Sequence, residues 1–137
     1  MGGSPWLLAT LAEACGKAGQ IDEGLHVLEE ALEAVQTKEE HLYEPEVYRL
    51  KGELLLQRST AQQGEAEQHL QQALAIARRQ QAKSLELRAA LSLSRLWQQQ
   101  GKRAEARQVL AEVYGWFTEG FDTADLQEAQ ALLEELA

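Results

Sequence analysis

The chain has 137 residues and a formal net charge of −9, with 45% hydrophobic and 26% charged residues. This length suits one compact domain, and the composition argues against disorder. The acidic balance excludes a nucleic-acid binder, because such a protein needs cationic residues to neutralise phosphates. No apolar run approaches the roughly 20 residues that span a bilayer, and residues 1–4 do not begin a signal peptide. We therefore expect a cytoplasmic protein without membrane contact.

The residue choice predicts seven helices and no strand, because Ala, Leu, Glu and Gln dominate and β-branched residues never cluster. The predicted helices span residues 5–18, 21–38, 42–58, 61–80, 84–100, 102–118 and 123–136. Pro5 and Pro45 fit the first turns of their helices, and Thr60 followed by Gln63 has the spacing of a capping box. The joints are short, so successive helices should pack antiparallel.

This order of helices predicts a single domain over residues 5–137, preceded by a leader or linker at residues 1–4. Its hairpins lie at about 5–38, 42–80 and 84–118. The helix at 123–136 carries many polar positions, so it suits the solvating cap that helical arrays require.

One sequence block recurs in each hairpin. Equivalent positions in the three copies are Ala31, Ala73 and Val113, at spacings of 42 and 40 residues. In the first copy a joint glycine is followed by a small residue, a large apolar residue and an alanine, at Gly19, Gly24, Leu28 and Ala31. The third copy has Gly101, Ala106, Leu110 and Val113 there, and so departs at the last position.

This pattern resembles the tetratricopeptide repeat family, although the spacings exceed its usual unit of about 34 residues. The resemblance implies an all-α fold, an α–α superhelix of three hairpins plus a C-terminal capping helix. It also implies a scaffold that binds proteins.

Several longer strings resemble a second group, the C-terminal repeat region of large bacterial signalling proteins that combine a nucleotide cyclase or DNA-binding module with a regulatory ATPase. They include residues 48–55, 75–88 and 115–123. This resemblance implies that the chain is the regulatory tail of a multidomain protein. The chain contains no cyclase or ATPase motif, so the resemblance carries no catalysis over.

The first helix of each hairpin lines the concave groove in tetratricopeptide arrays. Repeat register places nine residues there: Trp6, Glu13, Lys17, Arg49, Glu53, Gln57, Arg88, Arg95 and Gln99. Two interpretations of the three arginines remain open. They form a cationic strip for an acidic or C-terminal peptide segment, because guanidinium forks suit carboxylates. Alternatively, they pair internally with Glu46, Glu53 or Glu86.

The N-terminal hairpin begins without a covering helix. Its apolar stripe, Trp6, Leu7, Leu8 and Leu11, should then be exposed and should promote self-association. We expect a homodimer through this hairpin.

No catalytic, metal or cofactor site is expected. The three histidines have no metal-ligand spacing, and Cys15 falls on a core stripe. The aromatic residues of 114–121 suit a hydrophobic plug that docks the last helix. The sequence therefore predicts a non-catalytic protein–protein interaction or regulatory scaffold. A sensor for a small ligand and a self-assembly domain stay open as alternatives.

Overall fold

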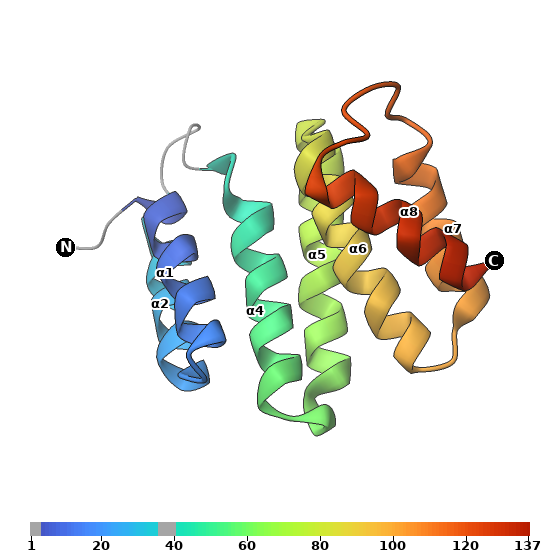
Figure 1. Cartoon of the computed structure of the whole chain (residues 1–137). Coiled ribbons are helices and arrows are strands. Elements are labelled where there is room, and N and C mark those ends of the chain that lie inside the picture. Colours follow the sequence, from blue (N-terminus) through green and yellow to red (C-terminus); the bar gives the residue numbers. More distant parts are fainter. Residues whose placement is uncertain (1–3, 36–40) are drawn as a thin grey trace.

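The computed structural model describes residues 4–35 and 41–137, and all regular structure within them is helical. The α-helices are α1 (Pro5–Lys17), α2 (Ile21–Ala34), α4 (Glu44–Arg58), α5 (Gln63–Gln80), α6 (Lys83–Gln99), α7 (Arg103–Tyr114) and α8 (Ala124–Leu136), with a short 3₁₀ helix η1 (Thr60–Gln62) before α5. Figure 1 shows three antiparallel helix pairs side by side, with α8 lying across the last pair. The predicted all-α superhelix of hairpins is confirmed.

Most helix ends agree with the predicted ranges, and their capping explains why. The Ser4 side chain accepts a hydrogen bond from the Leu7 amide ahead of α1, and Thr123 does the same for Leu126 ahead of α8. Gly19 and Gly101, in the turns that join the helices of the first and third pairs, have φ of 80° and 79°, a left-handed conformation that suits glycine. Residues 36–38, the predicted end of the second helix, lie outside the described residues.

Two predicted boundaries are wrong. Thr60 is not the N-cap of α5. The preceding residue, Ser59, has the extended backbone of an N-cap, and its side chain accepts a hydrogen bond from the Ala61 amide. Ser59 therefore caps the 3₁₀ helix η1, which begins at Thr60. The helix predicted at 102–118 ends at Tyr114. Gly115 weakens the helix there, and tight turns follow in which the Trp116 amide bonds the Val113 carbonyl.

Close approach of paired helices is permitted by small residues at the crossing points. A Cβ atom added to Gly52 on α4 would lie 2.9 Å from the Leu70 side chain of α5 and 3.0 Å from the Ala66 carbonyl oxygen. Ala12, Ala31, Ala66, Ala73 and Ala106 are fully buried in the same way. Small residues therefore occupy the seams between the paired helices.

The apolar core forms two clusters. One joins α1, α2 and the Val47, Leu50 and Leu54 side of α4. The other joins α5, α6, α7 and α8, and Tyr48 and Leu56 of α4 pack against it. Helix α4 therefore contributes opposite sides to the two clusters and connects them.

The surroundings of His69 on α5 shift its pKa. Its ring stacks on Tyr48 with 6.1 Å between centroids. Burial lowers its pKa below 6.5 and the charge of Lys51 lowers it further, against smaller opposing effects of Glu65 and Glu29.

The unfolded chain therefore takes up a proton at His69 more readily than the folded one. We expect the free energy of unfolding to fall as the pH drops below about 6.5, where the unfolded histidine protonates. Urea unfolding of the wild type and His69→Gln between pH 7.5 and 5 measures this. An identical pH slope in the two proteins would contradict the assignment to His69.

Candidate interaction groove

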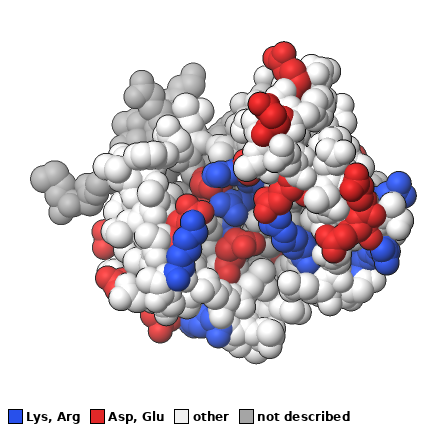
Figure 2. Space-filling view, viewed as in Figure 1, with Lys and Arg blue, Asp and Glu red and all other residues white. Residues whose placement is uncertain are grey.

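The first helices of the three pairs, α1, α4 and α6, line a groove together with α8. Figure 2 shows a hollow in this face in which basic and acidic side chains alternate. Four adjoining hollows of about 330, 260, 370 and 200 Å³ share lining residues, among them Glu13, Glu53 and Arg88. All nine residues that repeat register places in the groove line these hollows: Trp6, Glu13, Lys17, Arg49, Glu53, Gln57, Arg88, Arg95 and Gln99.

A carboxylate that is nearly buried organises the middle of the groove. Glu46 lies one turn before Arg49 on α4, and Arg49 donates to both of its oxygens, from Nε at 2.9 Å and from Nη2 at 2.8 Å. Arg88 of α6 donates to the same carboxylate at 2.6 Å. Arg49 also donates to Ser92 Oγ at 3.3 Å. The network connects α4 to α6 through charge-assisted hydrogen bonds.

The network shifts the pKa values of its members. Burial alone would raise the pKa of Glu46, but the hydrogen bond from Arg49 and the charges of Arg49 and Arg88 outweigh it, so the pKa falls below 4.5. Burial alone would lower the pKa of Arg49, but its hydrogen bond to Glu46 and the charges of Glu46, Glu53 and Glu13 outweigh burial and raise the pKa above its usual value. Both groups therefore stay charged at neutral pH.

Helix α8 supplies two further carboxylates that the sequence did not point to. Asp125 accepts from Arg88 Nε at 3.2 Å, and Glu128 lies 2.6 Å from Arg95 Nη2. Arg103 of α7 holds the far end of α8, because it donates to the carbonyl oxygens of Glu135 and Leu136. Helix α8 is thus both the predicted cap and one wall of the groove.

These contacts support the second interpretation of the arginines. All three groove arginines form ion pairs with carboxylates of the described residues. Glu46 is one of the predicted partners, whereas Glu53 acts on Arg49 through its charge. Glu86 does not face the groove: it is buried beside Arg78 and Lys83. Four cationic residues of the groove, Lys17, Arg49, Arg88 and Arg95, face five acidic ones, Glu13, Glu46, Glu53, Asp125 and Glu128.

An aromatic hollow lies at one end of the groove. Trp6 of α1 and Tyr43, just ahead of α4, line it with Leu50 and Leu85. Both aromatic side chains are roughly half exposed. Tyr43 and Leu85 were missed from the sequence, because each lies at the start of a helix, where repeat register is least certain.

The exposed N-terminal face is smaller than predicted. Trp6, Leu7 and Leu11 are 52%, 55% and 51% exposed, but Leu8 is only 8% exposed and belongs to the core. Successive residues of a helix point about 100° apart, so Leu7 and Leu8 cannot share one face.

The aromatic residues at the end of α7 and after it form only part of the predicted plug. Tyr114 and Phe117 pack against the C-terminal core, and Tyr114 lies 5.8 Å from the Phe121 ring. Trp116 is 57% exposed, and Lys83 Nζ lies 5.5 Å from its ring centre. Two of the four rings therefore remain largely on the surface.

The described residues contain no assembled metal site, because no three His, Cys, Asp or Glu side chains within 4–35 and 41–137 come together as ligands. Cys15 is free and buried, as its place on a core stripe predicted. None of the helices in the described ranges is long and apolar enough to cross a bilayer.

Comparison with known proteins gives one match. No curated protein and no solved structure matches the chain. A family model described as tetratricopeptide repeat matches residues 4–79, which cover α1 to α5 and so the first two hairpins. The third hairpin repeats the same helix-pair arrangement outside the matched range. Because the match spans more than half of the 137 residues and the fold agrees with it, the chain belongs to the tetratricopeptide repeat family.

Proposed function

We propose that the protein is a non-catalytic scaffold whose groove binds a segment of a partner protein. Tetratricopeptide repeats generally mediate protein–protein interaction, and repeat arrays use their concave surfaces for it. The observation that carries the proposal is the ordered wall of the groove. Glu46, Arg49 and Arg88 are held by mutual hydrogen bonds before any ligand arrives, which reduces the entropy lost on binding.

The groove favours a partner segment that carries a basic side chain next to an apolar one. The side chains of Glu13 and Glu53 make no hydrogen bond or ion pair with any residue of the described ranges, although both contribute their charge near Arg49. Glu13 and Glu53 line one hollow of the groove, and Glu13 also lines the neighbouring aromatic hollow of Trp6 and Tyr43. A lysine or arginine between these carboxylates and an aliphatic neighbour in the hollow would fit the groove.

An acidic segment, which the arginines alone would favour, meets an obstacle. It must displace Asp125 and Glu128 of α8 from Arg88 and Arg95. Each ion pair that it formed would replace an existing one, so the net gain is small.

Two blocked peptides with matched shape test the sign of the partner's charge. They have the sequences Ala-Leu-Arg-Leu-Ala and Ala-Leu-Glu-Leu-Ala, and titration followed by backbone amide NMR measures their affinity. We expect the basic peptide to bind more tightly and to shift resonances of α1, α4 and α6. Glu13→Gln with Glu53→Gln should weaken it by about tenfold, equivalent to about 1.4 kcal/mol.

Glu134→Gln is the matched control, because this exposed carboxylate on α8 lines no hollow of the groove. It should leave the affinity unchanged. Tighter binding of the acidic peptide would contradict the proposal, and so would equal affinity of the groove variant and the wild type.

A second candidate function is self-assembly through the N-terminal face, favoured by the exposure of Trp6, Leu7 and Leu11. We expect light scattering at tens of micromolar to give the mass of a dimer, and Leu7→Glu with Leu11→Glu to return it to that of a monomer. Burial of such side chains drives association, whereas buried carboxylates oppose it. A monomer mass for the wild type would exclude this candidate.

We infer that the scaffold acts within a multidomain bacterial signalling protein in the cytoplasm. The support is the resemblance of residues 48–55, 75–88 and 115–123 to the repeat regions of such proteins. A reading frame that continues upstream of Pro5 into a cyclase or ATPase module would agree with it, and a stop codon directly upstream would oppose it.

A further inference from the structure

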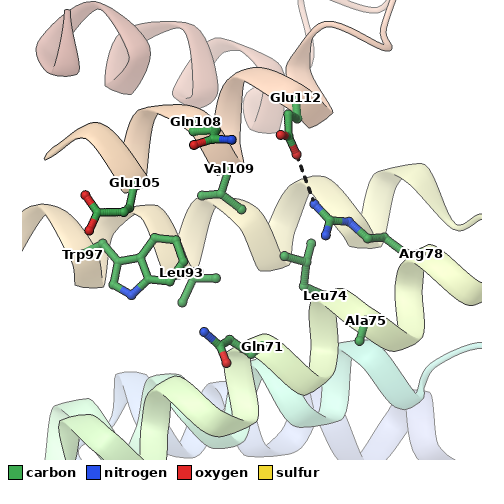
Figure 3. A pocket seen from close by; sticks show the side chains of 10 residues that line it. All are labelled: Gln71, Leu74, Ala75, Arg78, Leu93, Trp97, Glu105, Gln108, Val109 and Glu112. Atoms are coloured by element: carbon green, nitrogen blue, oxygen red, sulfur yellow. Dashed lines mark ion pairs between the residues drawn. The ribbon is translucent and has the colours of Figure 1, made fainter. Parts of the chain in front are cut away.

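A separate cleft of about 410 Å³ lies between the second helices of the second and third pairs, α5 and α7, with α6 as its floor. Figure 3 shows its ten lining residues. None of them lines the four hollows of the groove. We call this site the outer cleft.

Helical periodicity builds the walls of the outer cleft. On α5 it is lined by Gln71, Leu74, Ala75 and Arg78, and on α7 by Glu105, Gln108, Val109 and Glu112. Each set has the spacing i, i+3, i+4, i+7 and so forms one helix face. Leu93 and Trp97 of α6 lie one turn apart between these faces. The result is an apolar floor between polar rims.

The two ends of the outer cleft differ in charge. At one end Arg78 is already neutralised, because its Nε donates to Glu86 at 3.1 Å and its Nη2 lies 3.7 Å from Glu112. At the other end stand Trp97 and Glu105, as Figure 3 shows. The side chain of Glu105 forms no hydrogen bond or ion pair with any residue in the described part of the chain. This end therefore presents a carboxylate whose charge is not compensated.

The indole of Trp97 adds a second feature that attracts cations. Figure 3 shows the ring nearly face-on from the open side of the cleft, with its nitrogen turned toward α5 and with Glu105 beyond the opposite edge. An indole face is the aromatic surface that binds organic cations best, and a nearby carboxylate strengthens the attraction. The net charge of −9 also raises the local concentration of cations.

From this arrangement we propose that the outer cleft binds a small amphipathic organic amine. Its ammonium group lies between the Trp97 ring and the Glu105 carboxylate, and its hydrocarbon part covers Leu74, Leu93 and Val109. The volume falls within the range of small-molecule sites, which are mostly apolar with a few polar groups that fix orientation. The site is independent of peptide binding in the groove, because the two share no residue.

Two probes with the same ring and opposite charge test the proposal: 2-phenylethylammonium and 3-phenylpropionate. Amide and indole NMR signals of the full chain are followed during titration with each. We expect the cation to bind with a dissociation constant of about 1 mM or tighter and to shift the Trp97 indole signal and the facing stripes of α5 and α7. The anion should leave these signals in place.

Two variants assign the binding to the outer cleft. Glu105→Gln keeps the shape and removes the charge, so the cation should bind about tenfold more weakly. Ala75→Leu should fill the cleft from its α5 wall and block binding, and since Ala75 is exposed the chain still folds. Glu134→Gln makes the same charge change elsewhere and should leave the affinity unchanged. The proposal is overturned by binding of the anion as tight as that of the cation, by undiminished binding to Glu105→Gln, or by no response to the cation.

Discussion

Glu46→Gln is expected to lower the free energy of unfolding by about 3 kcal/mol, because it leaves the guanidinium of Arg49 without its counter-ion. The side chains of Glu46 and Arg49 are only 12% and 14% exposed, so water cannot replace the lost carboxylate fully. Glutamine retains one acceptor oxygen for Arg49 but no charge for Arg49 and Arg88 to share. Urea unfolding at neutral pH, followed by circular dichroism, measures the loss.

The matched control is Asp22→Asn, which removes the ion pair with Arg58 at a carboxylate that is 85% exposed. It should cost less than about 1 kcal/mol, as exposed pairs do. The pKa of Glu46 is lowered in the folded state, so its contribution is present above pH 4.5 and is lost as the pH falls through the lowered pKa. A cost for Glu46→Gln no larger than that of the control would show that the network adds no stability.

Gly52→Ala is expected to destabilise the protein by about 1–3 kcal/mol, although alanine is the better helix former by about 1 kcal/mol. The new methyl group would lie 2.9 Å from the Leu70 side chain and 3.0 Å from the Ala66 carbonyl oxygen. The carbonyl belongs to the backbone of α5 and cannot move aside, so α4 and α5 must separate.

Gly64→Ala is the companion variant, since no atom lies within 4 Å of an added Cβ in the first turn of α5. This change should raise the free energy of unfolding by about 0.5–1 kcal/mol. The two substitutions are chemically identical, so opposite signs in denaturant unfolding would isolate the helix contact. A gain in stability for Gly52→Ala would mean that α4 and α5 pack less closely than described.

The sequence predicted the helix pairs, because they depend on local periodicity. Repeat register puts Arg49 and Arg88 on helix faces that line one hollow. It could not place Asp125 and Glu128, because the position of α8 depends on the path of residues 115–123, which have no counterpart in the repeat.

Two errors could have been avoided from helix geometry. Glu86 and Arg88 are two residues apart, and positions i and i+2 lie about 200° apart around a helix, so they cannot face the same groove. Leu7 and Leu8 are consecutive residues of a helix and point about 100° apart, so they cannot belong to one exposed surface. The sequence also contains the i, i+3, i+4, i+7 stripes of α5 and α7 that line the outer cleft. It does not show that these two stripes face each other across α6, because that depends on the three-dimensional packing of the helices.

The division of the core into two clusters affects how the molecule opens. Helix α4 is the only element of the described ranges that contributes to both clusters, through Val47, Leu50 and Leu54 on one side and Tyr48 and Leu56 on the other. Stability in such an array is approximately a sum over neighbouring units. Helices α1 and α2 can therefore detach as a cooperative unit while α5 to α8 stay folded. The Glu46–Arg88 contact joins α4 to α6, so the residues that shape the groove also help to hold α4 on the C-terminal half when α1 and α2 detach.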